Sequence, residues 1–106
     1  MPPLIPPDQL DAVARRFRLL GEPVRLELLS VLHDEGEMTV GDLVDATGHR
    51  QANVSKHLSR MAEDGLLARR QDGLYVYYTV ADPTLAALCQ LILGRLNAEV
   101  ADLDDG

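Results

Sequence analysis

The sequence predicts a mainly helical domain that carries one β-hairpin, with its elements in the order ααααββα. Three observations support this prediction. Apolar residues recur every three or four positions over most of the chain, which is the spacing of helices buried on one face. After residue 65 the pattern changes to two short β-prone runs around Asp72-Gly73, a typical hairpin turn. The length of 106 residues, 46% of them hydrophobic, suits one domain and is too short for two.

The first half of the chain is expected to form three helices. Residues 1–7 contain four prolines and are predicted to be a flexible N-terminal arm, which leaves residues 8–104 as one domain. Asp8 is placed to cap a first helix that ends near Leu20. Pro23 starts a second helix that ends at Gly36, and Thr39 caps a short third helix over residues 40–47. The first helix has one apolar stripe of Leu10, Val13, Ala14, Phe17 and Leu20. The expected inward residues are Leu26, Leu29 and Leu32 or His33 in the second helix and Val40, Leu43 and Val44 in the third.

The second half is expected to form a helix, a hairpin and a final helix. The fourth helix runs from about residue 49 or 50 to residue 64, and Asp82-Pro83 opens the last one. One face of the second hairpin strand should pack on the core. The fourth helix is expected to bury Val54, Leu58 and Met61. The second strand has Tyr75, Tyr77 and Thr79 on one face and Val76, Tyr78 and Val80 on the other. The last helix has an apolar stripe of Leu85, Leu88, Ile92, Leu96, Val100 and Leu103.

Two helices separated by a tight turn at Gly48, the second polar on its outer face, form a helix-turn-helix unit. The second helix of such a unit enters the major groove of DNA and reads base edges, where Gln and Asn pair with adenine and Arg with guanine. Arg69 and Arg70 precede the hairpin turn, so the hairpin is predicted to be a wing that contacts the DNA backbone or minor groove. The predicted DNA-binding residues are Arg50, Gln51, Asn53, Ser55, Lys56, His57, Arg60, Arg69 and Arg70.

The charge distribution agrees with this prediction although the chain is acidic overall. The formal net charge is −7, but residues 49–70 carry five basic and two acidic side chains. The rest of the chain carries five basic and fifteen acidic residues. One basic surface on an otherwise acidic chain suits a protein with a single DNA-facing side.

The sequence also resembles a known family. The segment "FRLLGEPVRLELLSVL" and the segment "MTVGDLVDATGHRQANVSKHLSRMAEDGLLARRQDGLYVYYTV" are similar to the arsenical-resistance repressor (ArsR/SmtB-like) family of winged helix-turn-helix regulators, with "VSKHLSRM" and "DGLLARRQDGLYVYY" the most specific parts. The resemblance covers residues 10–93. It implies a recognition helix over residues 50–62, a wing over 67–79, and a homodimer that is built from the first and last helices, binds an imperfect palindrome and blocks transcription.

The residues themselves favour a dimer as well. Leu96, Val100 and Leu103 continue the apolar stripe of the last helix beyond the part that a small core can cover. An exposed apolar stripe usually marks a surface for a partner, and a two-fold dimer would present two recognition helices about one DNA turn apart. The predicted interface residues are Leu10, Val13, Phe17, Leu85, Leu88, Ile92, Leu96 and Val100.

No metal site and no cofactor is predicted. Family members can bind metal through a Cys-x-Cys pair before the recognition helix or through histidines on the last helix, and the matching stretches here contain neither. His33, Asp34, Glu35 and Glu37 could hold Zn²⁺ or Ni²⁺, but a solvated acidic helix end is the favoured interpretation. Cys89 is the only cysteine, and a buried structural role is favoured over a redox role or a bridge between two chains.

Other classes of protein are less favoured. No catalytic residue is predicted, since the chain shows no nucleophile–base pair, metal triad or phosphate-binding glycine loop. The main alternative is a winged-helix protein-interaction module without DNA binding, against which the basic segment argues. A lone cysteine and an N-terminus unlike a signal peptide predict a cytoplasmic protein with no membrane partner. The operator, the regulated genes and any small effector stay open.

Overall fold

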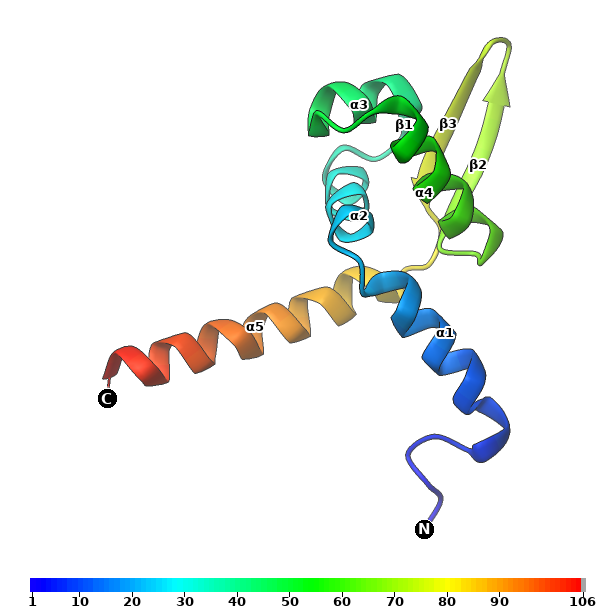
Figure 1. Cartoon of the computed structure of the whole chain (residues 1–106). Helices are drawn as coiled ribbons and strands as arrows, with labels where there is room; N and C mark the ends of the chain where they lie inside the picture. The colour runs from blue at the N-terminus through cyan, green and yellow to red at the C-terminus, as the bar shows by residue number, and fades with distance from the viewer. Residues whose placement is uncertain (106) are drawn as a thin grey trace.

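The computed structural model describes residues 1–105, and the side chains of residues 1–103 (Figure 1). A single 3₁₀ turn precedes five helices, and a three-stranded antiparallel sheet forms the wing. The elements are η1 (Pro7–Gln9), α1 (Leu10–Leu20), α2 (Pro23–Glu35), β1 (Met38–Thr39), α3 (Val40–Thr47), α4 (Gln51–Glu63), β2 (Leu67–Asp72), β3 (Tyr75–Val80) and α5 (Thr84–Asp105). The predicted mainly helical class, its element order and its hairpin are confirmed.

The core lies between α2, α3, α4 and the sheet. Leu43, Val54, Leu58 and Met61 are fully buried, as predicted for the third and fourth helices. The prediction for α2 is partly wrong, because its buried residues are Leu28, Leu29 and Leu32 whereas Leu26 is exposed. Leucine and valine occur nearly all round α2, so apolar spacing does not single out one face, and packing against α3 and α4 decides it.

The sheet has the strand order β1-β3-β2. The two-residue strand β1 was not predicted, and its Met38 pairs with Tyr78 forty residues later. Val76, Tyr78 and Val80 face the core, as expected for one of the two strand faces. The hairpin loop is Gly73-Leu74, one residue beyond the predicted turn. Gly73, the first residue of this loop, has a φ of +61°, and no residue other than glycine has a positive φ within the described part of the chain. Glycine with positive φ at the first loop position fits a type II′ turn.

Two of the three predicted helix caps are confirmed. Thr39 accepts a hydrogen bond from the Asp42 amide at 3.1 Å, and the Asp42 carboxylate accepts from the Thr39 amide at 3.0 Å. Asp82 accepts from the amide and hydroxyl of Thr84 at the start of α5. Asp8 was expected to cap α1, but it lies inside η1, and the N-cap of α1 is Gln9 with no side-chain bond.

Helices α1 and α5 project away from the rest of the molecule (Figure 1). The radius of gyration is 16.4 Å, whereas a compact domain of this length has about 13 Å. Most of the apolar stripe of α5 is consequently exposed, together with Leu10 and Phe17 of α1. The prediction that Leu85 belongs to a dimer interface is wrong, because this residue is buried in the core of its own chain. Over residues 1–105 no helix is both long and apolar enough to cross a lipid bilayer.

Candidate nucleic-acid interface

Helices α3 and α4 form the helix-turn-helix unit. Gly48 ends α3 in the left-handed region with a φ of +77°, and its amide donates to the carbonyl of Val44 at 2.8 Å. A residue with a Cβ is strained in that conformation, so glycine permits the tight turn between the helices. Arg50 is the N-cap of α4 and makes no side-chain capping bond. The first amides of α4 are thus left for solvent or for an anion such as a DNA phosphate.

The outward face of α4 is polar. A helix turns by about 100° per residue, so Lys56 and Ser59 lie opposite the buried stripe of the helix. Gln51 is exposed as well, while Asn53 and Ser55 are half-buried at the two flanks. Ser59 was not among the predicted contacts, although the same helical count identifies it. DNA contact by these residues stays a prediction.

His57 was predicted to lie on this outward face, and that prediction is wrong. Its relative exposure is 7%, and it lies between α4 and the start of α2. The Arg25 Nε donates to His57 Nδ1 at 3.1 Å, and His57 Nε2 lies 3.5 Å from Glu22 Oε2. Because Nδ1 accepts, a neutral ring carries its proton on Nε2, which faces the carboxylate.

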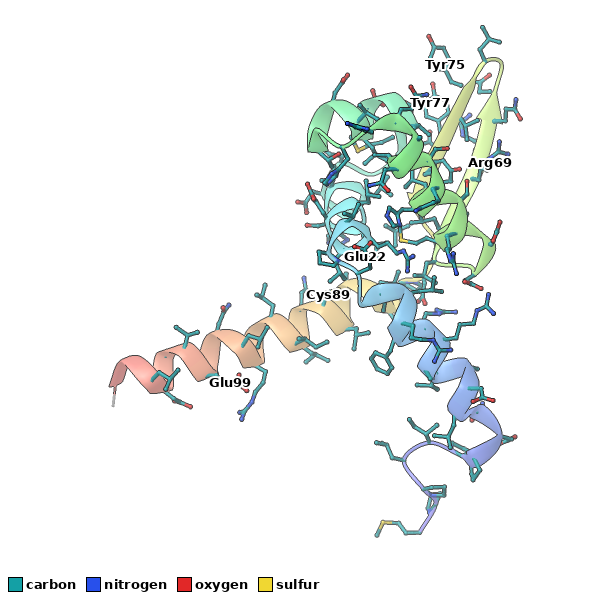
Figure 2. All side chains as sticks on the ribbon, viewed as in Figure 1. Glu22, Arg69, Tyr75, Tyr77, Cys89 and Glu99 are labelled. Carbon is teal, nitrogen blue, oxygen red and sulfur yellow. The ribbon has the colours of Figure 1, made fainter. Side chains whose placement is uncertain are left out.

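The environment of His57 keeps the ring neutral. Burial holds the pKa of His57 below its ordinary value of 6.5, and the carboxylate of Glu22 only partly offsets this effect. The positive charges of Arg25 and Lys56 lower the pKa further. Glu22, labelled in Figure 2, accepts through Oε1 from the Val24 amide as the N-cap of α2. Its Oε2 is buried without a hydrogen bond to any residue that the structure describes. His57 is therefore an internal contact between α4 and α2.

Arg70 was also predicted to contact DNA, and it has partners within the chain. Its Nη2 and Nε donate to the two carboxylate oxygens of Glu37 at 2.6 and 3.2 Å. Its guanidinium lies 4.5 Å from the centre of the Tyr77 ring, which Figure 2 shows on the hairpin. The hydrogen bond from Arg70 lowers the pKa of the Glu37 carboxyl. Glu37, one of the four residues considered for a metal, is therefore paired with Arg70 of the wing.

Arg69 lies on the opposite face of β2. Side chains alternate along a strand, so Arg69 shares the face of Leu67, which packs on the core next to α4. Arg69 is exposed and has no hydrogen bond or ion pair with another residue of the part that the structure describes (Figure 2). Of the two wing arginines, only Arg69 keeps its whole guanidinium group available on the side of α4.

Arg60 is in a different place from the rest of the predicted set. It lies on the last turn of α4 and lines a small pocket with arginines of α1 and α2. Sequence reasoning did not single out those arginines, because they belong to a different part of the chain. Asp64, which follows α4, accepts from Arg15 of α1 at 3.1 Å and thereby joins the two helices.

The residues considered for an effector do not form a metal site. Among residues 1–103 no three His, Cys, Asp or Glu side chains lie close enough together to hold a metal ion. Cys89 was expected to be buried, and it is half-buried at an apolar pocket of about 500 Å³ between α2 and α5. His33 is exposed at the rim of the same pocket. This pocket adjoins the exposed stripe of α5, since Ile92 and Leu93 line it.

Comparison with known proteins agrees with this geometry. A family profile described as "Helix-turn-helix domain" matches residues 20–70. The chain is 39% identical over 100 residues to a "Probable mercury resistance operon repressor" of Streptomyces lividans. The match covers 94% of this chain and 79% of that protein. The arsenical resistance operon repressor of Escherichia coli is 35% identical over 65 residues, 61% of this chain and 56% of that protein. The chain belongs to the ArsR family of winged helix-turn-helix regulators.

A solved structure supports the same assignment for the whole fold. The homodimeric winged helix-turn-helix DNA-binding domain of Mb0332 from Mycobacterium bovis matches with a TM-score of 0.75 and 29% identity. The match covers 92% of this chain and 91% of that one. This ArsR-family protein is accordingly a DNA-binding transcriptional regulator and not an enzyme. The family resemblance drawn from the sequence motifs is confirmed.

Proposed function

We propose that this ArsR-family regulator is a cytoplasmic, homodimeric repressor that binds a palindromic operator and releases it in response to an effector. The observation that carries the proposal is the division of α4 into a fully buried apolar stripe and an outward face with Lys56 at its centre. Such a helix fits the major groove with its N-terminal residues at the base edges.

Within this proposal Gln51 and Asn53 read bases, because both lie in the first turn of α4 and carry amides that pair with adenine. Arg50, Ser55 and Lys56 contact phosphates around them. Arg69 reaches the DNA backbone or minor groove next to the recognition helix from the wing. His57 is not assigned to reading DNA, because it is buried between α4 and α2, and Arg70 is not assigned to it, because it already forms an ion pair with Glu37.

The dimer is supported by the exposed apolar residues of α1 and α5. Ile92, Leu96 and Val100 lie on one side of a helix that projects into solvent (Figure 1). Burial of this exposed apolar surface by a second copy lowers the free energy of the two chains. A two-fold axis between the α5 helices would also place two copies of α4 on the same side of DNA.

The test is a fluorescence-anisotropy titration of the protein onto duplex DNA from its own upstream region, with random duplex as the control. We expect tight, salt-sensitive binding at two protomers per site. The variants Gln51→Ala and Asn53→Ala should reduce the preference for the operator, since a bidentate base contact is worth about 1–3 kcal/mol. Equal affinity of the wild-type protein for both duplexes would contradict the proposal.

A further inference from the structure

A small polar pocket lies where α1 and α4 end and α2 begins. Its volume is about 280 Å³. Four guanidinium groups and one carboxylate line it, which leaves an excess of three positive charges in a chain whose net charge is −7. Four of the ten basic residues of the protein thus converge on one site. The residues around the pocket are Arg15, Arg18, Leu19, Arg25, Arg60 and Asp64.

Two of the four arginines are held in place by contacts within the chain. Arg15 donates through Nε to Asp64 Oδ1 at 3.1 Å, and its Nη2 lies 2.8 Å from the same oxygen. Arg25 donates through Nε to His57 and through Nη1 to the carbonyl of Leu19 at 3.2 Å. A guanidinium group has five N–H donors, so each of these arginines keeps donors for a further acceptor.

The other two arginines, Arg18 and Arg60, are exposed. Neither makes a hydrogen bond or an ion pair with another residue among those whose side chains the structure describes. Like charges that converge repel one another, and an anion between them removes this cost. The pocket therefore has two arginines with partners inside the chain and two further arginines whose donors have no partner among the residues whose side chains the structure describes.

We propose that this pocket binds a phosphate-type oxyanion and that its source is the DNA backbone. Arginine matches phosphate through paired N–H donors, and a tetrahedral phosphate has enough oxygens to accept from several guanidinium groups at once. The DNA source is favoured because Arg60 belongs to the last turn of the recognition helix α4. The assignment to DNA rests on the proposed function, and it would extend the DNA contact from α4 to α1. A free phosphate ion is the alternative ligand with the same chemistry.

The first experiment needs no DNA. The melting temperature is measured in inorganic phosphate and in sodium chloride at equal ionic strength, for the wild type, for Arg18→Ala/Arg60→Ala and for Arg95→Ala. Arg95 is the control, because it lies on α5 beside Glu99 and its loss removes a positive charge that does not line the pocket. We expect phosphate to raise the melting temperature of the wild type and the control in a saturable way, and to have no such effect on the double variant.

The second experiment measures DNA affinity against salt concentration for Arg18→Ala, Arg60→Ala and Arg95→Ala. Each lost phosphate contact should reduce the slope of log K against log [salt] by about 0.9, with no change in base preference. A reduced slope in the pocket variants alone assigns the site to the DNA backbone. A slope equal to that of Arg95→Ala, with phosphate protection retained, overturns the DNA source and supports a free anion.

Two outcomes separate this inference from the proposed function. Absence of phosphate protection together with control-like salt slopes would overturn the phosphate pocket while operator binding by the wild type remained intact. Absence of DNA binding by the wild type would instead overturn the proposed function and the DNA source. In that case the melting experiment alone would still decide whether the pocket binds phosphate.

Discussion

His57 joins the recognition helix to α2 through Arg25 and Glu22. Of the three polar residues, His57 is buried between α4 and α2, while Glu22 and Arg25 are half-buried. A buried polar group without a partner costs more than the average hydrogen bond gains. The orientation of α4 on the rest of the domain hence depends on one imidazole ring as well as on apolar packing.

We expect His57→Leu to lower the free energy of unfolding by about 1–3 kcal/mol, since it leaves the Nε of Arg25 without its acceptor and puts an apolar side chain beside Glu22 Oε2. Urea unfolding at one fixed protein concentration measures this, because the stability of a dimer depends on concentration. His33→Leu is the matched control, as His33 is exposed on α2. Equal losses in the two variants would mean that the buried contacts of His57 add no stability.

The lowered pKa of His57 also predicts a pH dependence. The unfolded chain takes up the proton near the ordinary pKa of 6.5, while the folded protein takes it up only at lower pH. Between these values the unfolded state binds more protons, so the free energy of unfolding should fall as the pH drops below about 6.5. The pKa values of Glu37 and Asp82 are lowered too, and their contributions are lost only in the acid range of carboxyl groups.

Unfolding of the wild type and of His57→Leu between pH 7.5 and 5 tests this dependence. The variant should show a shallower fall of the free energy of unfolding in this range, with the loss at acid pH unchanged. An equally steep fall in both proteins would exclude His57 as its source.

At the scale of elements, the wing separates two arginines that are neighbours in sequence. Arg69 and Arg70 alternate between the two faces of β2, so one lies on the side of α4 and the other on the side of β1. The contact of Arg70 with Glu37 depends on β1, whose two residues pair with β3. On one face of the wing Arg70 is paired with Glu37, whereas on the other face Arg69 has no hydrogen bond or ion pair with another described residue.

We expect Arg69→Ala to weaken binding to all DNA sequences and to reduce the salt slope by about 0.9 per protomer, that is by about 1.8 for a dimer that loses one phosphate contact in each protomer. Arg70→Ala should change the slope less, because its guanidinium already pairs with Glu37. Anisotropy titrations of both variants over a range of salt concentrations provide the comparison. A larger effect of Arg70→Ala would show that this ion pair opens when DNA binds.

At the scale of the whole molecule, α1 and α5 give the chain an open shape that a single copy does not fill. The extents are 52 × 40 × 20 Å. Exposed leucine and isoleucine residues recur along much of α5. The core ends at Leu85 and the partly buried Leu88. Beyond that point the stripe of α5 has no partner within residues 1–103.

Leu96→Glu should convert the protein to a monomer, because it places a charge in the stripe that a second copy would cover. Leu91→Glu is the matched control: Leu91 is also exposed on α5, but five residues of helix turn it about 140° away from Leu96. Sedimentation analysis measures the mass of both variants. A dimeric Leu96→Glu protein would contradict an interface formed by this stripe.

Much of the fold and part of the candidate site follow from local patterns. The helix-turn-helix unit and the wing can be predicted from the sequence, because the turns at Gly48 and Gly73 and the apolar spacing of α4 each depend on only a few neighbouring residues. The same holds for the caps Thr39 and Asp82, whose partners lie within three positions. The sequence alone consequently determined the helical order, the wing and the side of α4 on which the polar residues lie.

Only the tertiary structure decided which polar residues are available. His57 is buried because Glu22 and Arg25 meet it from α2, thirty-two or more positions earlier, and Arg70 is paired because Glu37 lies across the sheet. The four arginines of the pocket likewise come from three helices. Helical and strand periodicity tells which way a side chain points, but its partners depend on how distant segments pack, and no local pattern encodes that contact.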